Sequence, residues 1–330
     1  MFDGYDHVSG QQLGLHTGRA SEFKSFDEFF EAYKRQVKYF ADIKVEGSNK
    51  ITKIFAKYMP APFLSILTDD CIESGLDYNA GGARYNINYL QGVGIGTITD
   101  AMTAIKYNVF DKNRFTLEQV ADACLNDFEG DDIMLHVVRD MTPKYGNDDD
   151  YADGVMQDIF NNYRQTICGR PNMKNGKWGI DMLPTTCHVY FGEVMLASAN
   201  GRRAHKPTSE GISPEKGADT NGPTAVARSC AKMDHIKTGG TLLNQKFAPS
   251  VVAGEEGLER MADFVRTYFT MDAHHVQFNV VDRATLIAAQ NNPEEYRDLI
   301  VRVAGYSDHF RNLSKALQDE IIERTEQTFD

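Results

Sequence analysis

The chain has 330 residues, of which 42% are hydrophobic and 25% charged, proportions that are ordinary for a soluble globular protein. Its formal net charge of −12 argues against nucleic acid or an anionic membrane as the main partner. The opening MFDGYDHVSG has neither the basic nor the apolar region of a signal peptide, and no apolar run approaches the ~18 residues of a membrane span. We therefore expect a cytoplasmic protein.

The cysteines are scattered along the chain and never occur in a CxxC pair. They are Cys71, Cys124, Cys168, Cys187 and Cys230. An odd number of isolated cysteines is typical of a reducing compartment, and the lack of paired spacing predicts no zinc site.

Two capping patterns mark helix starts in the first half of the chain. The opening DGYDHVSGQQLGLHTGRASEF is rich in glycine and polar residues and is predicted to be a loop. Ser25 and Glu28 then form the capping box SFDE, followed by aromatic residues at helical spacing. Thr116 and Gln119 repeat the pattern and predict a helix over TLEQVADACLNDF.

Two further helices are predicted toward the C-terminus. The segment EEGLERMADFVRTYF predicts a helix with Leu258, Met261, Val265 and Phe269 on one stripe. The segment SKALQDEIIERTEQ predicts the final helix.

Strand candidates alternate with these helices. TTCHVYF (185–191) and HVQFNVV (275–281) are β-branched and aromatic with a period of two, and GTLLNQKF and LIVRV are short apolar runs closed by turn residues. Isolated strands between helices predict an α/β fold with mostly parallel strands. A compact tail of strands and helices begins near residue 270, so we predict a division into 1–270 and 271–330.

The glycine-rich segment QGVGIGTITD resembles a nucleotide-binding loop only superficially. Its glycines are Gly92, Gly94 and Gly96, so the third comes one position too early for GxGxxG, and no Walker lysine follows. We predict close backbone packing at a strand-to-helix turn instead.

The acidic segment GNDDDYADG does not meet the requirements of a calcium loop. With Asp148 as first ligand, Ala152 takes the third ligand position and Phe160 the twelfth, where a glutamate is needed. We predict an acidic helix start, which the helix dipole favours.

Three side chains that could carry chemistry are assigned structural roles. His274 and His275 are adjacent on a predicted strand and point to opposite faces, so they cannot share a metal, and one should pack in the core. Cys187 is predicted to be buried on a central strand, with His188 facing the other side, and not to be a catalytic thiol.

The segment RVAGYSDHF (302–310), with QFNVVDRATLIAAQNNPEEYRDLIV before it and LSKALQDEIIERTEQTF after it, closely resembles the C-terminal domain of glycyl radical enzymes. MLPTTCHVYFGEV, ISPEKGADTNGPTA and DHIKTGGTLLNQKFAPSVV resemble the dehydratase and decarboxylase branch of that pyruvate formate-lyase-like superfamily. The resemblance implies the C-terminal half of a ten-stranded barrel over 1–270 and a glycyl radical domain over 271–330.

The resemblance places the radical on Gly305. An α-carbon radical is stabilised when the amide nitrogen donates into it and the carbonyl withdraws from it, which requires a planar centre. A Cβ would crowd that centre, and glycine has none. No other cofactor and no metal is expected.

The resemblance also implies partners. A separate activase with S-adenosylmethionine and an iron–sulfur cluster would remove a hydrogen atom from Gly305, and a cysteine thiyl would then attack a small-molecule substrate. A dehydratase would expel water from the substrate radical with acid–base help. Thr185 matches a position that lines the substrate pocket in the family.

The family's Gly-Cys-x-Glu loop, which carries the thiyl cysteine, does not occur in the sequence. The segment that normally follows this loop resembles DGYDHVSGQQLGLHTG, so we expect the chain to begin just after it. An open half-barrel exposes apolar surface, and we therefore expect an N-terminal half chain or self-association.

Several assignments remain open beside a dehydratase of a small hydroxylated substrate. A decarboxylase, a diol dehydratase, an alkyl-adding synthase or a formate acetyltransferase would share the radical motif. The chain could also be a spare-part radical module, although such modules are much shorter, or a gene fragment without activity. A neighbouring reading frame that encodes Gly-Cys-x-Glu would favour a complete enzyme in two pieces.

Overall fold

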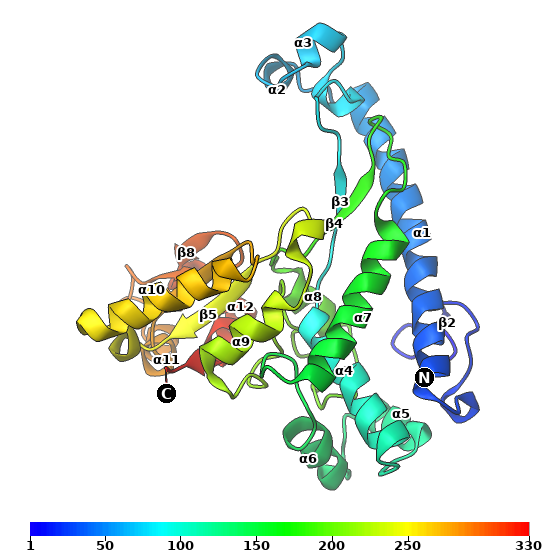
Figure 1. The fold of residues 1–330 in the computed structure, drawn as a ribbon, viewed down its shortest axis with the longest axis vertical. Helices are drawn as coiled ribbons and strands as arrows, with labels where there is room; N and C mark the ends of the chain where they lie inside the picture. The colour runs from blue at the N-terminus through cyan, green and yellow to red at the C-terminus, as the bar shows by residue number, and fades with distance from the viewer. Residues whose placement is uncertain (330) are drawn as a thin grey trace. The chain divides into compact units, whose positions relative to one another are not determined.

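The computed structural model describes residues 1–329 as helices interleaved with short strands (Figure 1). The helices are α1 Phe26–Tyr58, α2 Pro62–Ile66, α3 Cys71–Ser74, α4 Ile95–Ile105, α5 Leu117–Leu125, α6 Asp132–Asp140, α7 Asp150–Ile167, α8 Cys187–Glu193, α9 Gly222–Ala231, α10 Gly254–Thr270, α11 Arg283–Asn291 and α12 Lys315–Glu323. The strands are β1 Tyr5–Asp6, β2 Gln11–Gln12, β3 Asn88–Gln91, β4 Trp178–Asp181, β5 Leu243–Phe247, β6 Val276–Val280, β7 Ile300–Arg302, β8 Ser307–His309 and β9 Glu326–Gln327. No helix within residues 1–329 is both long and apolar enough to cross a membrane.

The chain divides into two compact units. The smaller unit comprises Phe2–Gln91 and Asn161–Asp181, and the larger one comprises Gly92–Phe160 and the chain from Met182 to the C-terminus, together with Met1. The predicted boundary near residue 270 falls inside the larger unit and stays a prediction.

The smaller unit is organised by the 33-residue helix α1. Its β3 and β4 pair in parallel, and the Trp178 Nε1–H donates to Asn49 Oδ1 at 3.1 Å, which ties β4 to α1. Ser25 caps the helix as predicted, because its Oγ accepts the Glu28 N–H at 3.2 Å. The Glu28 carboxylate, however, accepts the N–H of Lys24, one residue before the expected partner.

The larger unit contains a parallel three-stranded sheet. Its order is β6–β5–β9, and β5 is almost wholly buried. Helix α10 lies along this sheet (Figure 1), with the Phe264 ring 6.4 Å from that of Phe247 on β5. The face of α10 that packs on the sheet is offset from the predicted stripe. The helix buries Phe264 and Tyr268, whose rings stack on one another, while Leu258 and Phe269 are exposed.

The C-terminal segment has a local core of its own. Its buried members all lie between residues 281 and 322: Val281, Leu286, Ala289, Val301, Val303, Phe310, Leu313, Ile321 and Ile322. These side chains come from α11, from the β7–β8 hairpin and its flanks, and from α12, so the hairpin is held by packing as well as by hydrogen bonds.

Most predicted local features are confirmed. Thr116 and Gln119 form both bonds of the capping box. A Cβ on Gly96 would lie 2.7 Å from the Ser213 carbonyl oxygen, which is the close backbone packing predicted for the glycine-rich segment. The acidic segment starts α7, and the Lys232 ammonium lies within 2.7 Å of both Asp150 and Asp153 there.

The strand predicted over 185–191 is wrong. This segment forms the short helix α8, whose start is favoured because the Thr185 Oγ1 accepts the Cys187 N–H at 3.3 Å. The helical phase exposes Cys187 and buries His188, the reverse of the burial predicted for the cysteine. Strand propensity is a weak preference that such tertiary context overrides.

One part of the prediction for the histidine pair is also wrong, because neither histidine packs in the core. His274 and His275 are both exposed, because β6 begins only at Val276 and the pair precedes it. The buried histidine of this region is His235, whose Nδ1 lies 2.6 Å from Thr241 Oγ1 and whose Nε2 lies 2.9 Å from the Cys230 carbonyl oxygen.

Candidate active site

The segment RVAGYSDHF forms a tight antiparallel hairpin between β7 and β8. Arg302 pairs with Ser307, and the Val303 N–H donates to the Tyr306 carbonyl at 2.9 Å across the turn. Gly305 is the third residue of this four-residue turn, with φ +81°, where glycine is strongly favoured. Among residues 1–329, apart from Gly305 and its two chain neighbours, no atom lies within 4 Å of the place that a Cβ on Gly305 would occupy. Conformation, rather than crowding, therefore selects glycine in the resting turn.

The buried Asn279 fastens the hairpin to the sheet. Its Nδ2 donates to the Arg302 carbonyl at 2.8 Å, and its Oδ1 accepts the Arg302 N–H at 2.8 Å. One side-chain amide on β6 thus supplies the donor and the acceptor that a neighbouring strand would give. The residue that precedes the turn is fixed by its backbone.

The Arg302 side chain reaches forward over the turn. Its Nη2 donates to the Gly305 carbonyl at 3.1 Å, and its Nη1 lies 3.4 Å from Ser307 Oγ. The Nε–H donates to the buried Gln277 at 2.7 Å, which fixes the plane of the guanidinium. The Gly305 carbonyl thereby faces a positive charge.

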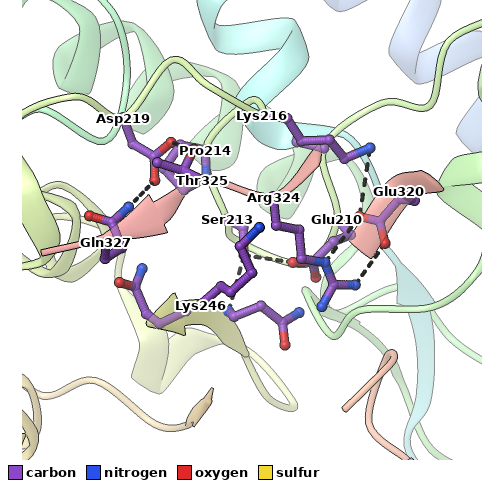
Figure 2. Close-up of a pocket in the computed structure, with 13 residues that line it drawn as sticks. Glu210, Ser213, Pro214, Lys216, Asp219, Lys246, Glu320, Arg324, Thr325 and Gln327 are labelled. Carbon is purple, nitrogen blue, oxygen red and sulfur yellow. Dashed lines mark hydrogen bonds and ion pairs between the residues drawn. The ribbon is translucent and has the colours of Figure 1, made fainter. Parts of the chain in front are cut away.

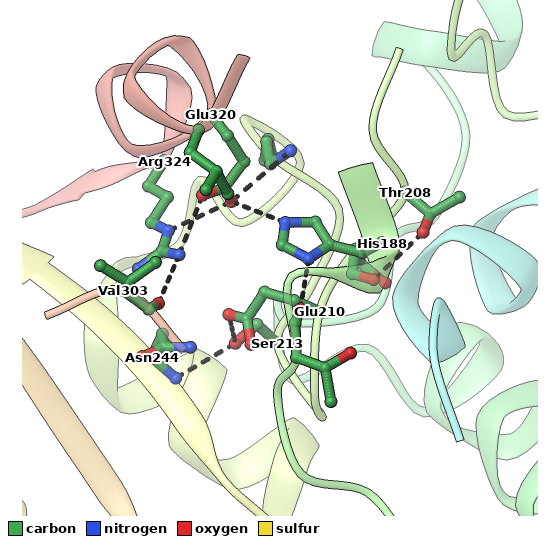
Figure 3. Close-up of polar contacts among 12 residues, drawn as sticks. His188, Thr208, Glu210, Ser213, Asn244, Val303, Glu320 and Arg324 are labelled. Atoms are coloured by element: carbon green, nitrogen blue, oxygen red, sulfur yellow. Dashed lines mark hydrogen bonds and ion pairs between the residues drawn. The ribbon is translucent and has the colours of Figure 1, made fainter. Parts of the chain in front are cut away.

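A second arginine holds the turn from behind. Arg324 follows α12 directly, and its Nη2 donates to the Val303 carbonyl at 2.9 Å (Figure 3). The same guanidinium forms a two-point ion pair with Glu320, at 2.9 and 3.2 Å. Both side chains are buried, so the pair is a fixed support rather than a mobile surface contact.

Glu320 is the centre of a buried cluster of charges. Besides Arg324, its carboxylate faces Lys216 Nζ at 3.6 Å and His188 Nε2 at 3.3 Å. Burial alone would raise the pKa of Glu320, but Arg324, Lys216 and His188 outweigh it and hold this pKa well below its ordinary value. Glu320 is therefore an anion that gathers three cationic or donor side chains.

His188 connects this cluster to Thr185. Its Nδ1 lies 2.7 Å from the Thr185 carbonyl oxygen, which can only accept, so Nδ1 carries a hydrogen. A continuous line of polar contacts thus runs from Thr185 through His188, Glu320 and Arg324 to the hairpin (Figure 3).

The structure therefore joins the two residues singled out from the sequence, Gly305 and Thr185, through groups that the sequence did not reveal. Thr185 is half-buried at the start of α8, and Gly305 is exposed at the tip of the hairpin. Glu320 and Arg324 carry one signal, their i, i+4 spacing, but that spacing is typical of exposed helix pairs. Nothing in the sequence marks His188 or Asn279.

A small polar pocket is lined in part by the cluster itself, through Lys216, Glu320 and Arg324 (Figure 2). Asp219 lines it and accepts hydrogen bonds from Thr325 and, at 2.6 Å, from Gln327. Burial raises the pKa of Asp219 to about 6. Within residues 1–329 no three His, Cys, Asp or Glu side chains gather closely enough to hold a metal ion.

The raised pKa of Asp219 predicts a pH dependence of stability. Between the ordinary value of 3.8 and about 6, the folded state binds more protons than the unfolded state. The free energy of unfolding should therefore fall as the pH rises through this interval, by about 3 kcal/mol from this group. Urea titrations at several pH values should show that Asp219→Asn removes this part of the slope. Equal slopes for the two proteins would contradict the assignment.

Two protein families match the chain. The pyruvate formate lyase-like family matches residues 1–192, and the glycine radical family matches residues 208–311, which include the hairpin. The chain is 63% identical over 327 residues to trans-4-hydroxy-L-proline dehydratase of Clostridioides difficile, covering 99% of this chain and 41% of that protein.

Solved structures agree with these matches. The crystal structure of the Clostridioides difficile hydroxyproline dehydratase, with trans-4-hydroxy-L-proline bound, has a TM-score of 0.97 at 63% identity and covers 99% of this chain. The glycerol-bound B12-independent glycerol dehydratase of Clostridium butyricum has a TM-score of 0.95 at 40% identity. This chain spans 41% of the length of each of these relatives.

Proposed function

Because the chain belongs to the pyruvate formate lyase-like glycyl radical enzymes, we propose that it is the radical-bearing portion of a dehydratase, a carbon–oxygen lyase, with the radical stored on Gly305. The observation that carries this proposal is the turn itself. An exposed glycine with φ +81° sits at its tip, within the segment that matches the glycine radical family. In the part of the chain that the structure describes, no residue beyond the two neighbours of Gly305 comes within 4 Å of its Cβ position.

Because Gly305 is exposed at the tip of the hairpin, both the activase and a thiol could reach its α-carbon. A separate S-adenosylmethionine activase with an iron–sulfur cluster removes one hydrogen atom from the Gly305 α-carbon, and the remaining electron stays in the planar backbone. The Gly305 radical then takes the hydrogen atom of a thiol, which restores the glycine and leaves a thiyl, and the thiyl abstracts a hydrogen atom from the substrate. Loss of water follows, aided by an acid and a base.

We propose that the thiol is supplied by another polypeptide segment. The sequence contains no Gly-Cys-x-Glu loop, and the relatives are more than twice as long as this chain. Exposed apolar side chains of the smaller unit support a partner, either an N-terminal half chain or a second copy. Phe63, Leu67, Ile72 and Tyr85 are 69–81% exposed.

We propose a separate role for each of the two segments of the chain. Residues 271–330 form the glycyl radical domain, supported by the local core that lies between residues 281 and 322. Residues 1–270 contribute the second half of a ten-stranded barrel. Thr185 contacts the substrate, since it lies at a helix start that is linked to the hairpin by polar contacts.

The proposed substrate is a small hydroxylated molecule such as 4-hydroxyproline. The support is the 63% identity to trans-4-hydroxy-L-proline dehydratase, compared with 40% to the glycerol dehydratase. A diol remains the second candidate, because the structure of the glycerol dehydratase, which acts on a molecule with neighbouring hydroxyl groups, is also closely similar, with a TM-score of 0.95.

Anaerobic activation tests the radical site. The chain is incubated with S-adenosylmethionine, a reductant and the activase of a 4-hydroxyproline dehydratase, and electron paramagnetic resonance (EPR) should show a glycyl doublet. Admission of oxygen should then cut the backbone at Gly305, as read by denaturing mass spectrometry. A full-length chain after a clear doublet and exposure to air would place the radical elsewhere.

Turnover tests the substrate. A polypeptide that carries the Gly-Cys-x-Glu loop is added to the activated chain, and trans-4-hydroxy-L-proline and glycerol are supplied separately. Consumption of the proline derivative supports the proposed substrate. Consumption of glycerol alone would replace it with the diol assignment.

A further inference from the structure

We infer that Arg302 tunes the Gly305 radical, because its guanidinium donates a charge-assisted hydrogen bond to the carbonyl of the radical residue. The inference rests on the proposed function and adds a residue that acts on the electronic state of the glycine. The contact joins Arg302 Nη2 to the Gly305 oxygen at 3.1 Å.

The guanidinium is held in place for this contact. Its Nε–H donates at 2.7 Å to Gln277, whose own amide donates to Asn244. The backbone of Arg302 is fixed at both its N–H and its carbonyl by Asn279, at 2.8 Å each. Arg302 cannot turn away from Gly305 without giving up a bond to a buried partner.

The contact acts on the Gly305 carbonyl, the group that withdraws electron density from the radical centre. Loss of one hydrogen atom from the Gly305 α-carbon leaves an unpaired electron that is delocalised from the amide nitrogen toward the carbonyl oxygen. A cationic donor at that oxygen favours the delocalised form, while Arg302 itself neither gains nor loses a proton. An exposed carbonyl would otherwise depend on water, whose dipoles must reorganise when the radical forms, whereas Arg302 is already oriented.

The hydrogen bond can be tested without the radical. Glycine labelled with 13C at its carbonyl and tyrosine labelled with 15N select Gly-Tyr pairs, and the sequence contains two of them, Gly4-Tyr5 and Gly305-Tyr306. Arg302→Gln should move the Gly305 carbonyl resonance upfield, as expected on loss of a strong donor. The Gly4 resonance should stay unchanged, because that carbonyl accepts the Gly14 N–H.

The effect on the radical is tested by EPR after activation. Arg302→Gln should lower the radical yield about tenfold, the ratio that corresponds to one charge-assisted hydrogen bond. At high field the largest g value of the glycyl radical should rise in Arg302→Gln. This value increases when the oxygen that shares the unpaired electron has no hydrogen-bond donor. Arg302→Lys keeps the charge but loses the planar fork, and should give intermediate values.

Arg311→Gln is the matched control. Arg311 lies just beyond β8 and pairs with Glu294 at 3.5 Å, so the carbonyl resonance and the radical should both be unaffected. An unchanged Gly305 resonance in Arg302→Gln would overturn the inference, and so would an unchanged g value at equal yield. A shifted resonance combined with no radical in the unsubstituted protein would instead remove the proposed function, and the role of Arg302 with it.

Discussion

Replacing Gly305 by alanine is expected to abolish radical storage while the chain still folds. A Cβ at this position crowds the planar centre that the radical needs. In the resting turn the same Cβ meets no described residue other than its chain neighbours within 4 Å, so the folded state loses only the cost of an alanine at positive φ, about 1–2 kcal/mol. After incubation with activase and S-adenosylmethionine, the EPR doublet should be absent and air should leave the chain at full length.

Gly130 offers a matched control for this experiment. It has the same φ of +81° as Gly305 and is also exposed, and within residues 1–329 only its own chain neighbours come within 4 Å of its Cβ position. Gly130→Ala should therefore lose similar stability and keep the full doublet. A doublet in Gly305→Ala would show that the radical is not stored on Gly305. Loss of the doublet in Gly130→Ala as well would show that backbone strain rather than radical chemistry decides the outcome.

Substitution of Glu320 by glutamine is expected to have the largest effect on stability. Removal of one charge leaves Arg324, Lys216 and His188 around a neutral amide in a buried site. Loss of one partner of a buried ion pair costs about 3–5 kcal/mol. Urea unfolding at pH 7 should show this loss, and the hairpin should loosen because Arg324 no longer has its anchor.

The neighbouring Asp319 provides the comparison. It lies on the same helix and pairs with Lys315 at 2.8 Å, but its side chain is 43% exposed. Asp319→Asn should therefore cost less than about 1 kcal/mol. Equal losses for the two variants would mean that Glu320 is not the centre of the cluster.

The low pKa of Glu320 also fixes the direction of its pH dependence. A carboxyl whose pKa is held below the ordinary 4.5 in the folded state stabilises the protein fully above that value. Its contribution is lost as the pH falls through the folded-state pKa. Acid should therefore narrow the difference in stability between the unsubstituted chain and Glu320→Gln.

Local sequence patterns predicted the parts of the fold that depend on neighbours in the chain. The capping box of Thr116 and the close packing at Gly96 are examples, since each needs only a short segment to specify it. Gly305 was singled out by the resemblance of its motif and flanking segments to glycyl radical enzymes, not by a local pattern alone. Helix α8 was missed because strand-like residues there yield to a helix that buries His188.

The support of the site could not be predicted, because its members come from distant segments. In the sequence, Asn279 is an ordinary polar residue of a predicted strand. Only the structure shows that its side-chain amide forms hydrogen bonds with the Arg302 backbone. The i, i+4 spacing of Glu320 and Arg324 predicts an exposed helix pair, whereas in the structure the pair is buried and His188 contacts the Glu320 carboxylate. Tertiary contacts alone turn these residues into a site.

The local core around the hairpin has a consequence for any cut made at Gly305. Residues 306–330 would become a separate peptide, yet Phe310 and Ile321 are wholly buried, and β9 stays in the sheet beside β5. The two pieces should remain together as a nicked complex, as complementing fragments do. Size-exclusion chromatography under native conditions should then show a particle of unchanged size. The two fragments should separate only in denaturant.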